Sequence, residues 1–239
     1  SKECIQRDIR YLIKVWQSVE AKSKLMKGTG LLYRDVDLVI RIVRDLFNED
    51  VEQMVIDDEI VYGRVKDLLQ SMAPEWADRL KLYKGSNIFE YYEIEAEAVS
   101  AGNRQVPLAS GGFLVIDKTE AMTVIDVNTG SFVGNISLGE TAFALNKEAA
   151  VEIMHQLRLR DIGGIVLVDF IDMEKEEHNK ALLQLLRQLA QQDRTKTHVV
   201  DITALGLVEI TRKKTRHNID NLLYRYCPVC QGTGRILST

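Results

Sequence analysis

Residues 113–128 of the chain read FLVIDKTEAMTVIDVN, and residues 165–171 read IVLVDFI. Both stretches are rich in the β-branched and large apolar residues that are typical of β-strands. A short polar turn divides the first stretch, so we predict a hairpin with strands at 113–116 and 122–127. The second stretch is interrupted only by Asp169, and we expect a strand that is covered on both faces.

The segments around these strands predict helices. Residues 139–160 carry apolar side chains at spacings of three and four, which indicates a long amphipathic helix. A second helix is expected at 175–193, followed by strands at 198–203 and 207–211. Strands that alternate with helices predict an α/β fold.

The N-terminal part of the chain predicts a second, smaller α/β layer. A linker with two glycines is expected at 24–33, and a turn-rich boundary at 102–112. Trp16 and Trp76 are expected in the core. The predicted helices lie at 4–25, 36–47, 59–72 and 89–99, and the predicted strands at 51–57 and 79–83.

Composition limits the class of protein. The chain has 239 residues, of which 46% are hydrophobic and 28% charged, as in soluble globular proteins. No apolar run approaches the roughly 18–20 residues that span a bilayer, and we expect no membrane span. The sequence begins without methionine and without a signal peptide, so we expect a piece of a longer chain.

Charge and cysteine content narrow the class further. A net charge of −4 argues against a surface that binds nucleic acid everywhere, although it permits local basic clusters. Three cysteines over this length do not make a disulfide scaffold. A reducing cytoplasm is therefore the expected location.

Two aspartates stand at the ends of predicted strands. Asp126 and Asp169 each follow an apolar run, and a carboxylate buried there is costly unless it is paired or bound to a metal. Asn128 lies on the same strand face as Asp126 and is placed to orient it. Oxygen ligands favour Mg²⁺ or Mn²⁺ over zinc. The alternative interpretation is that these aspartates cap helices or turns, as Asp172 is placed to do.

Five longer strings carry a resemblance to a known family. They are IDVNTG at 125–130, QLRLRDIGG at 156–164, VDFIDM at 168–173, GLVEITRK at 206–213 and CPVCQGTG at 227–234. In this order they resemble the ribonuclease E/ribonuclease G family. The resemblance is strongest over residues 105–239.

This resemblance implies a function. It implies a magnesium-dependent endoribonuclease that hydrolyses single-stranded RNA to 5′-phosphate and 3′-hydroxyl products in RNA processing and decay. Asp126 and Asp169 match the family's magnesium-binding catalytic aspartates, and Asn128 matches the asparagine that supports the first. A bacterial cytoplasm is the expected location, with the plastid stroma as the alternative.

The resemblance also implies a domain organisation. Residues 1–38 resemble the tail of a 5′-end-sensing region, 39–101 a ribonuclease H-like subdomain, 102–223 a deoxyribonuclease I-like catalytic subdomain and 224–239 a zinc-link. The family's S1 RNA-binding domain is not present in this sequence. Expected partners are single-stranded RNA, other copies of the chain in a homodimer or homotetramer, and other RNA-decay proteins.

Cys227 and Cys230 have the spacing of half a zinc site. The sequence offers His217, His198, Cys4 or a second copy of the chain for the remaining ligands, and a redox pair is an alternative. The resemblance implies a structural Zn²⁺ shared by two subunits.

A basic run follows the last predicted strand. Arg212, Lys213 and Lys214 are candidate RNA-binding residues, with a solvated surface as the alternative.

Two competing functions remain for the whole chain. One is a non-catalytic RNA-binding, zinc-linked assembly module, and the other is a deoxyribonuclease.

Overall fold

The computed structural model describes most of the chain, in two compact units formed by residues 1–92 and 93–239. The described residues are 2–33, 38–130, 138–214, 223–225, 227–230, 232 and 234. Among their helices, none combines the length and the apolar character that crossing a bilayer requires.

The first unit contains a small α/β layer. Its two short strands, β1 and β2, pair in parallel, with Met54 opposite Leu80. Asp58 caps α3 by accepting a hydrogen bond from the backbone N–H of Val61, at 2.8 Å. The elements are α1 (Lys2–Leu25), α2 (Leu38–Leu46), β1 (Met54–Ile56), α3 (Glu59–Met72), a 3₁₀ helix (Pro74–Arg79), β2 (Leu80–Leu82) and α4 (Ile88–Tyr91).

The two tryptophans of this unit have different environments. Trp76 is partly buried and meets Phe47 edge to face, with ring centroids 5.7 Å apart. Trp16 is 67% exposed on α1, so the prediction that it lies in a core is wrong for this structure.

The single helix predicted at 89–99 is interrupted at Glu93, whose φ of 57° separates α4 from α5 (Ile94–Ser100).

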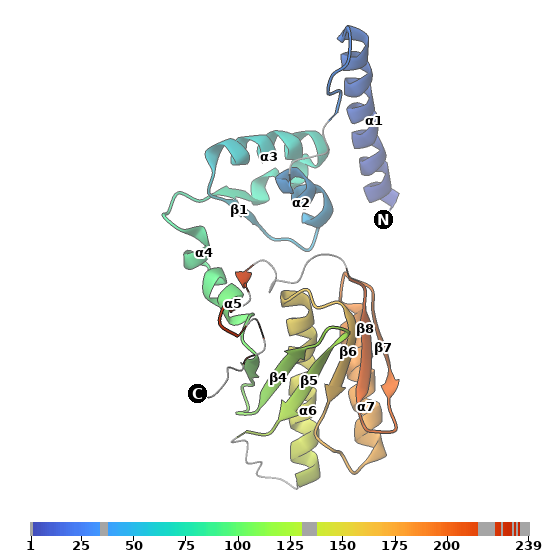
Figure 1. Ribbon diagram of the computed structural model, residues 1–239. Coiled ribbons are helices and arrows are strands. Elements are labelled where there is room, and N and C mark those ends of the chain that lie inside the picture. Colours follow the sequence, from blue (N-terminus) through green and yellow to red (C-terminus); the bar gives the residue numbers. More distant parts are fainter. Residues whose placement is uncertain are drawn as a thin grey trace. The chain divides into compact units, whose positions relative to one another are not determined.

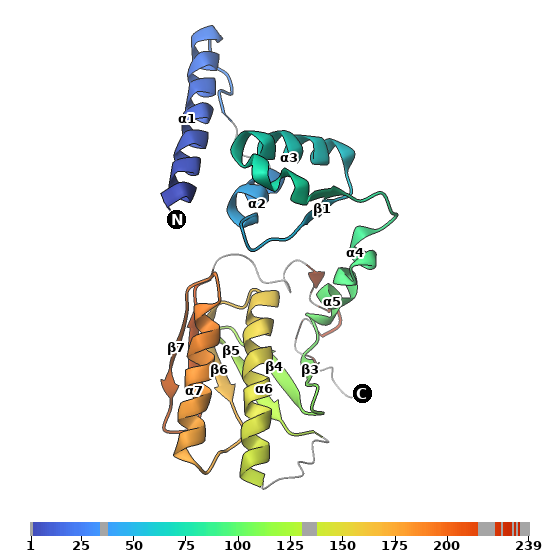
Figure 2. The same cartoon turned by 180° about the vertical axis from the view of Figure 1, so that it is seen from behind.

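The second unit is a six-stranded sheet in the order β3-β4-β5-β6-β8-β7. Its helices α6 and α7 lie together on one face of the sheet (Figures 1 and 2). The elements are β3 (Gln105–Pro107), β4 (Phe113–Lys118), β5 (Met122–Asn128), α6 (Leu138–Leu159), β6 (Gly164–Asp169), α7 (Glu176–Gln191), β7 (Thr197–Ile202) and β8 (Val208–Arg212). The predicted α/β class is therefore confirmed.

Burial alternates along the central strands. Ile125, Val166 and Val168 point toward α6 and α7 and are fully buried. The intervening residues point to the other face, where Ile165 is 47% exposed. The prediction that this strand is covered on both faces is wrong, because both helices pack on the same side of a largely antiparallel sheet.

One strand pair differs from the others in direction. β5 and β6 are parallel, whereas every other neighbouring pair in this sheet is antiparallel. A parallel pair needs a long crossover connection, and α6 lies in that connection. As a result the carboxyl ends of β5 and β6 meet at the same edge of the sheet.

Candidate active site

Asp126 and Asp169 are direct neighbours across the parallel strands β5 and β6. Adjacent strands lie about 4.8 Å apart, so the two carboxylates stand side by side. Both are exposed on the open face, and the expectation that they are buried is wrong. The alternation of the strands turns Ile125 and Val168 inward and the aspartates outward. The site is therefore a pair of like charges that water reaches.

Asn128 supports the first aspartate, as the sequence predicts. Its side-chain amide donates a hydrogen bond to Oδ2 of Asp126, at 2.8 Å. Asp126 and Asn128 are two residues apart in an extended strand, so both side chains point to the same face of the sheet. The amide therefore fixes the orientation of the Asp126 carboxylate.

Glycines allow the loops around Asn128 to pack closely. A Cβ atom on Gly112 would lie 2.8 Å from the carbonyl oxygen of Asn128, so a larger residue would displace this strand end. Gly130 has a φ of 54°, in the left-handed region that favours glycine. Both positions thus constrain the backbone next to the Asp126–Asn128 pair.

The backbone after Asp169 is held by a residue that the sequence interpretation missed. Asn146 on α6 has no exposed surface, and its amide group makes two hydrogen bonds to Ile171. Its Nδ2 donates to the carbonyl oxygen of Ile171, at 2.8 Å, and its Oδ1 accepts from the N–H, at 3.1 Å. A polar residue among the apolar positions Leu145 and Ala149 was the available signal. Asn146 therefore positions the segment that follows Asp169.

A third acidic side chain shares the open face. Glu209 on β8 lies opposite Leu167 in the register, which makes it the diagonal neighbour of Asp169. Such diagonal positions are about 7–8 Å apart. Glu209 therefore adds negative potential beside the aspartate pair without belonging to it.

A polar cluster joins the first turns of the two helices. Lys175 Nζ contacts Glu140 Oε1 at 2.8 Å, and the pKa of Glu140 is lowered by this hydrogen bond and by the charge of Lys175. His178 stacks on Phe143 with ring centroids 4.2 Å apart. The His178 side chain is only 13% exposed, because it packs between the two helices against Phe143.

The aspartate pair has the chemistry of a magnesium site. Among the described residues, no three His, Cys, Asp or Glu side chains gather closely enough to enclose a metal. Two carboxylates with open access fit Mg²⁺, which usually keeps several waters and binds through one or two carboxylates together with substrate phosphates. They do not resemble the four-ligand cage of a structural zinc site.

Arg212 is not available to RNA, which corrects its prediction as an RNA-binding residue. Its side chain is 4% exposed and contacts two acids, Asp193 at 2.9 Å and Asp161 at 2.8 Å. Its Nη1 also donates to the carbonyl oxygen of Ile162, at 3.0 Å. The guanidinium thus joins β8 to the turns that follow α6 and α7.

Hydrogen bonding also perturbs Asp193. Burial alone would raise the pKa of this carboxyl, but hydrogen bonds from Arg212, Thr195 and Thr197 outweigh burial and leave the pKa lowered. Asp193 is therefore held in its charged form.

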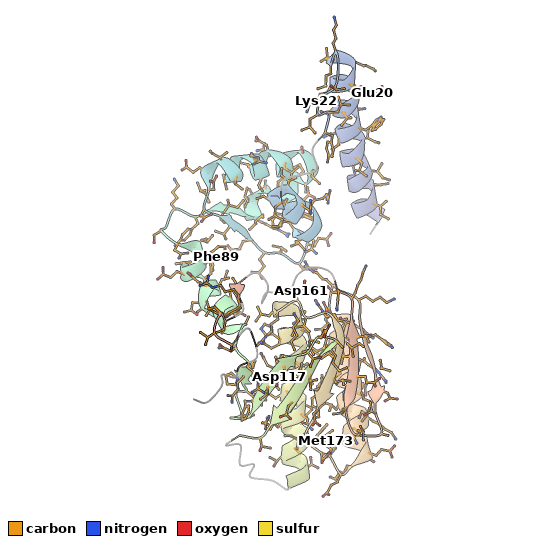
Figure 3. The ribbon with its side chains drawn as sticks, viewed as in Figure 1. Glu20, Lys22, Phe89, Asp117, Asp161 and Met173 are labelled. Carbon is orange, nitrogen blue, oxygen red and sulfur yellow. The ribbon has the colours of Figure 1, made fainter. Side chains whose placement is uncertain are left out.

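Lys213 and Lys214 are exposed but lie away from the aspartates. They follow Arg212, which pairs with Gly164, and at about 3.3 Å per residue Gly164 lies roughly 16 Å along β6 from Asp169. Asp161 and Met173, which precede and follow β6, mark the two ends of this unit (Figure 3). The lysines are therefore not in contact distance of a phosphate bound at the aspartate pair.

The Cys227–Cys230 pair lies in the described C-terminal segment. Cys227 is exposed, and the pKa of its thiol is lowered by hydrogen bonds from the backbone N–H groups of Cys230 and Val229. Of the other candidate ligands, His198 is exposed on β7, whereas His217 and the side chain of Cys4 lie outside the described residues. The zinc assignment stays a prediction.

Comparison with known proteins gives one consistent result. Residues 1–215 match the model of the Ribonuclease E/G family. The chain is 41% identical to Ribonuclease G of Haemophilus influenzae over 237 residues, which cover 99% of this chain and 48% of that protein. It is 41% identical to Ribonuclease G of Escherichia coli K12 over 230 residues, covering 96% and 47%. It is 34% identical to Ribonuclease E of the same strain over 238 residues, covering 99% and 22%. The chain thus spans about half the length of the two Ribonuclease G relatives. It spans 22% of the length of Ribonuclease E.

Proposed function

The chain belongs to the ribonuclease E/G family, and from this membership we propose that its second unit carries the catalytic centre of an endoribonuclease of RNA processing and decay. One observation supports the location of this centre above all others. Asp126 and Asp169 are in register on parallel strands and exposed on the open face. Two acids side by side repel each other, so a pair with a purely structural role would need a neighbouring cation to balance its charge.

We propose that Asp126 and Asp169 hold Mg²⁺ and that Asn128 fixes the first of them. The bound ion would supply positive charge for the phosphodiester and lower the pKa of the attacking water. Through an ion held between them, the two carboxylates would bring the scissile phosphate to this edge of the sheet. Water attacks phosphorus in line and the P–O3′ bond breaks, which leaves a 3′-hydroxyl and a 5′-phosphate.

The surroundings of the pair support a single-stranded substrate. Helices α6 and α7 lie on the opposite face of the sheet from the two carboxylates, so neither of these helices blocks an extended strand of RNA. Asn146 keeps the chain after Asp169 in place through Ile171.

We further propose the deoxyribonuclease I-like assignment for residues 102–223 and the ribonuclease H-like assignment for 39–101.

We also propose that Cys227 and Cys230 bind a structural Zn²⁺ shared by two subunits in a homodimer or homotetramer. A lowered thiol pKa favours the thiolate, which is the form that binds zinc. Sedimentation before and after zinc chelation tests the model. Chelation is expected to dissociate the assembly, and an unchanged monomer that retains zinc would contradict it.

The test of catalysis uses the longest natural form of the protein. Single-stranded RNA and DNA of matched sequence are incubated with Mg²⁺ or with EDTA, and the product ends are mapped. We expect cleavage of RNA in Mg²⁺ alone. Binding of RNA without cleavage would favour the non-catalytic assembly module, and cleavage of DNA would favour a deoxyribonuclease.

A further inference from the structure

A second polar site lies away from the aspartate pair. A pocket of about 320 Å³ opens where β4 ends and β5 begins, next to the turn between α6 and β6. This volume is within the range of small-ligand sites. The side chains that matter here are Arg104, Asp117, Lys118, Thr123, Arg160 and Tyr224.

Arg160 forms the inner wall of this pocket. It is only 5% exposed, although it carries a permanent charge. Its Nε donates to Oε1 of Gln156, at 2.6 Å, and Nε2 of Gln156 donates to Glu152, at 2.7 Å. This chain of side chains along α6 fixes the guanidinium before any ligand arrives, which lowers the entropic cost of binding.

The rim of the pocket is also mostly basic. Arg104 makes two hydrogen bonds to Asp117, each of 2.6 Å, and Lys118 follows on the surface. The Asp117 carboxylate occupies the fork of Arg104 and lowers the positive potential of the pocket. Among the described residues that line the pocket, three are cations and one is an anion, and an incoming anion competes with Asp117 for Arg104.

An aromatic ring completes the wall. The hydroxyl of Tyr224 donates to the carbonyl oxygen of Val99, at 2.8 Å, which anchors the ring beside the pocket. Gly102 permits this packing, because a Cβ atom there would collide with the Tyr224 ring. An aromatic side chain next to arginines is suited to a nucleotide, whose base stacks on aromatic rings and whose phosphate pairs with guanidinium groups.

We propose that this pocket binds the phosphate of a nucleotide, with Arg160 and Lys118 as the main cationic contacts and Asp117 as an opposing charge. The shared chemistry is a phosphate next to a base, supplied by a free mononucleotide or by a nucleotide within RNA. The site does not depend on the proposed catalytic centre.

Calorimetric titration with inorganic phosphate, adenosine 5′-monophosphate and a short oligoribonucleotide tests the proposal. The full-length protein carries Asp126→Asn and Asp169→Asn and is kept in EDTA, so that the aspartate pair contributes no metal-dependent binding. We expect Arg160→Met to weaken binding about tenfold or more and Lys118→Gln about threefold. Asp117→Asn should strengthen it about two- to threefold, because it removes the repulsive charge and releases Arg104.

The control is Lys180→Gln, which removes the same charge from the exposed surface of α7. It should leave binding unchanged. Weaker mononucleotide binding in Lys118→Gln supports a site for free nucleotides, and weaker binding of the oligonucleotide alone supports a site for RNA. Because opposite signs are expected for Lys118→Gln and Asp117→Asn, the test stands even if Arg160→Met does not fold. Equal affinities in Lys118→Gln, Asp117→Asn and the parent protein for all three probes would overturn the proposal.

Discussion

The charged residues at the two ends of the central sheet are arranged in opposite ways. Where β5 and β6 end, Asp126 and Asp169 stand side by side, exposed and of the same sign. Where β6 begins, Arg212 is buried between Asp193 and Asp161, which carry the opposite sign. Both ends use charged residues on neighbouring elements, but within the part of the chain that the structure describes only the Arg212 end is balanced by opposite charges.

We use this difference to distinguish the proposed catalytic site from a structural ion cluster. A buried ion pair whose members satisfy each other stabilises the arrangement of the chain, and removing one member leaves an uncompensated charge. Like charges in register destabilise a sheet unless something outside the chain compensates them. The Arg212 cluster is therefore balanced by its own side chains, whereas the Asp126–Asp169 pair requires a cation from outside.

The largest expected effect is on catalysis at the unbalanced end. Asp126→Asn or Asp169→Asn should reduce RNA cleavage by about a thousandfold or more, because several kcal/mol of charge stabilisation are lost. Thermal unfolding in EDTA should show no loss of stability, since a like-charge repulsion is removed. Cleavage at the rate of the unmodified protein, or marked destabilisation, would contradict the comparison.

The next effect is on stability at the balanced end. Arg212→Met should lower the free energy of unfolding by about 3–5 kcal/mol, because Asp193 stays buried without its partner. Lys213→Met is the matched control on the next, exposed residue, and should change stability by about 0.5 kcal/mol or less. Urea unfolding measures both. Equal effects would show that the ion cluster does not hold this end together.

Positioning residues near the aspartates should give intermediate effects that distinguish two roles. Asn128→Ala should slow cleavage about 10–100-fold, as when a group that orients a metal ligand is lost, with little change in unfolding. Asn146→Ala should also destabilise the protein by about 1–3 kcal/mol, because it leaves the backbone groups of Ile171 without partners. A stability loss in Asn128→Ala as large as that in Asn146→Ala would remove the distinction.

The smallest expected effect is a dependence on pH at the balanced end. The folded-state pKa of Asp193 is lowered, so its contribution to stability is present above the unfolded value of about 3.9 and is lost as pH falls through the folded pKa. Unfolding free energies measured from about pH 5 downward should decline less steeply in Asp193→Asn. If the unfolding free energy fell equally steeply with pH in Asp193→Asn and in the parent protein, Asp193 would not contribute to stability in this way.

Much of the fold could be predicted from the sequence because its periodicities are strong. The hairpin, α6 and α7 appear close to their predicted bounds, since long apolar patterns determine them. The strand β3 was missed because it is only three residues long and includes Pro107. The open face of the sheet was also missed, because an apolar run does not tell which of its two sides is covered.

The candidate site divides in the same way. The geometry of Asn128 and Asp126 follows from the two-residue period of a strand, so the sequence predicted it. The role of Asn146 depends on a contact between α6 and the segment after β6, which no local pattern contains. Arg212 was assigned to RNA binding because it belongs to a basic run, and only the fold brings Asp161 and Asp193 to it.

The parallel pairing of β5 with β6 also orders events in folding. The β4–β5 hairpin is local and can form within microseconds. Asp169 reaches Asp126 only after the whole crossover has closed and α6 has docked, and such non-local pairing is slow. A partly folded chain therefore holds one aspartate but not the pair. The proposed cleavage of RNA should therefore appear last in refolding, after the sheet has closed.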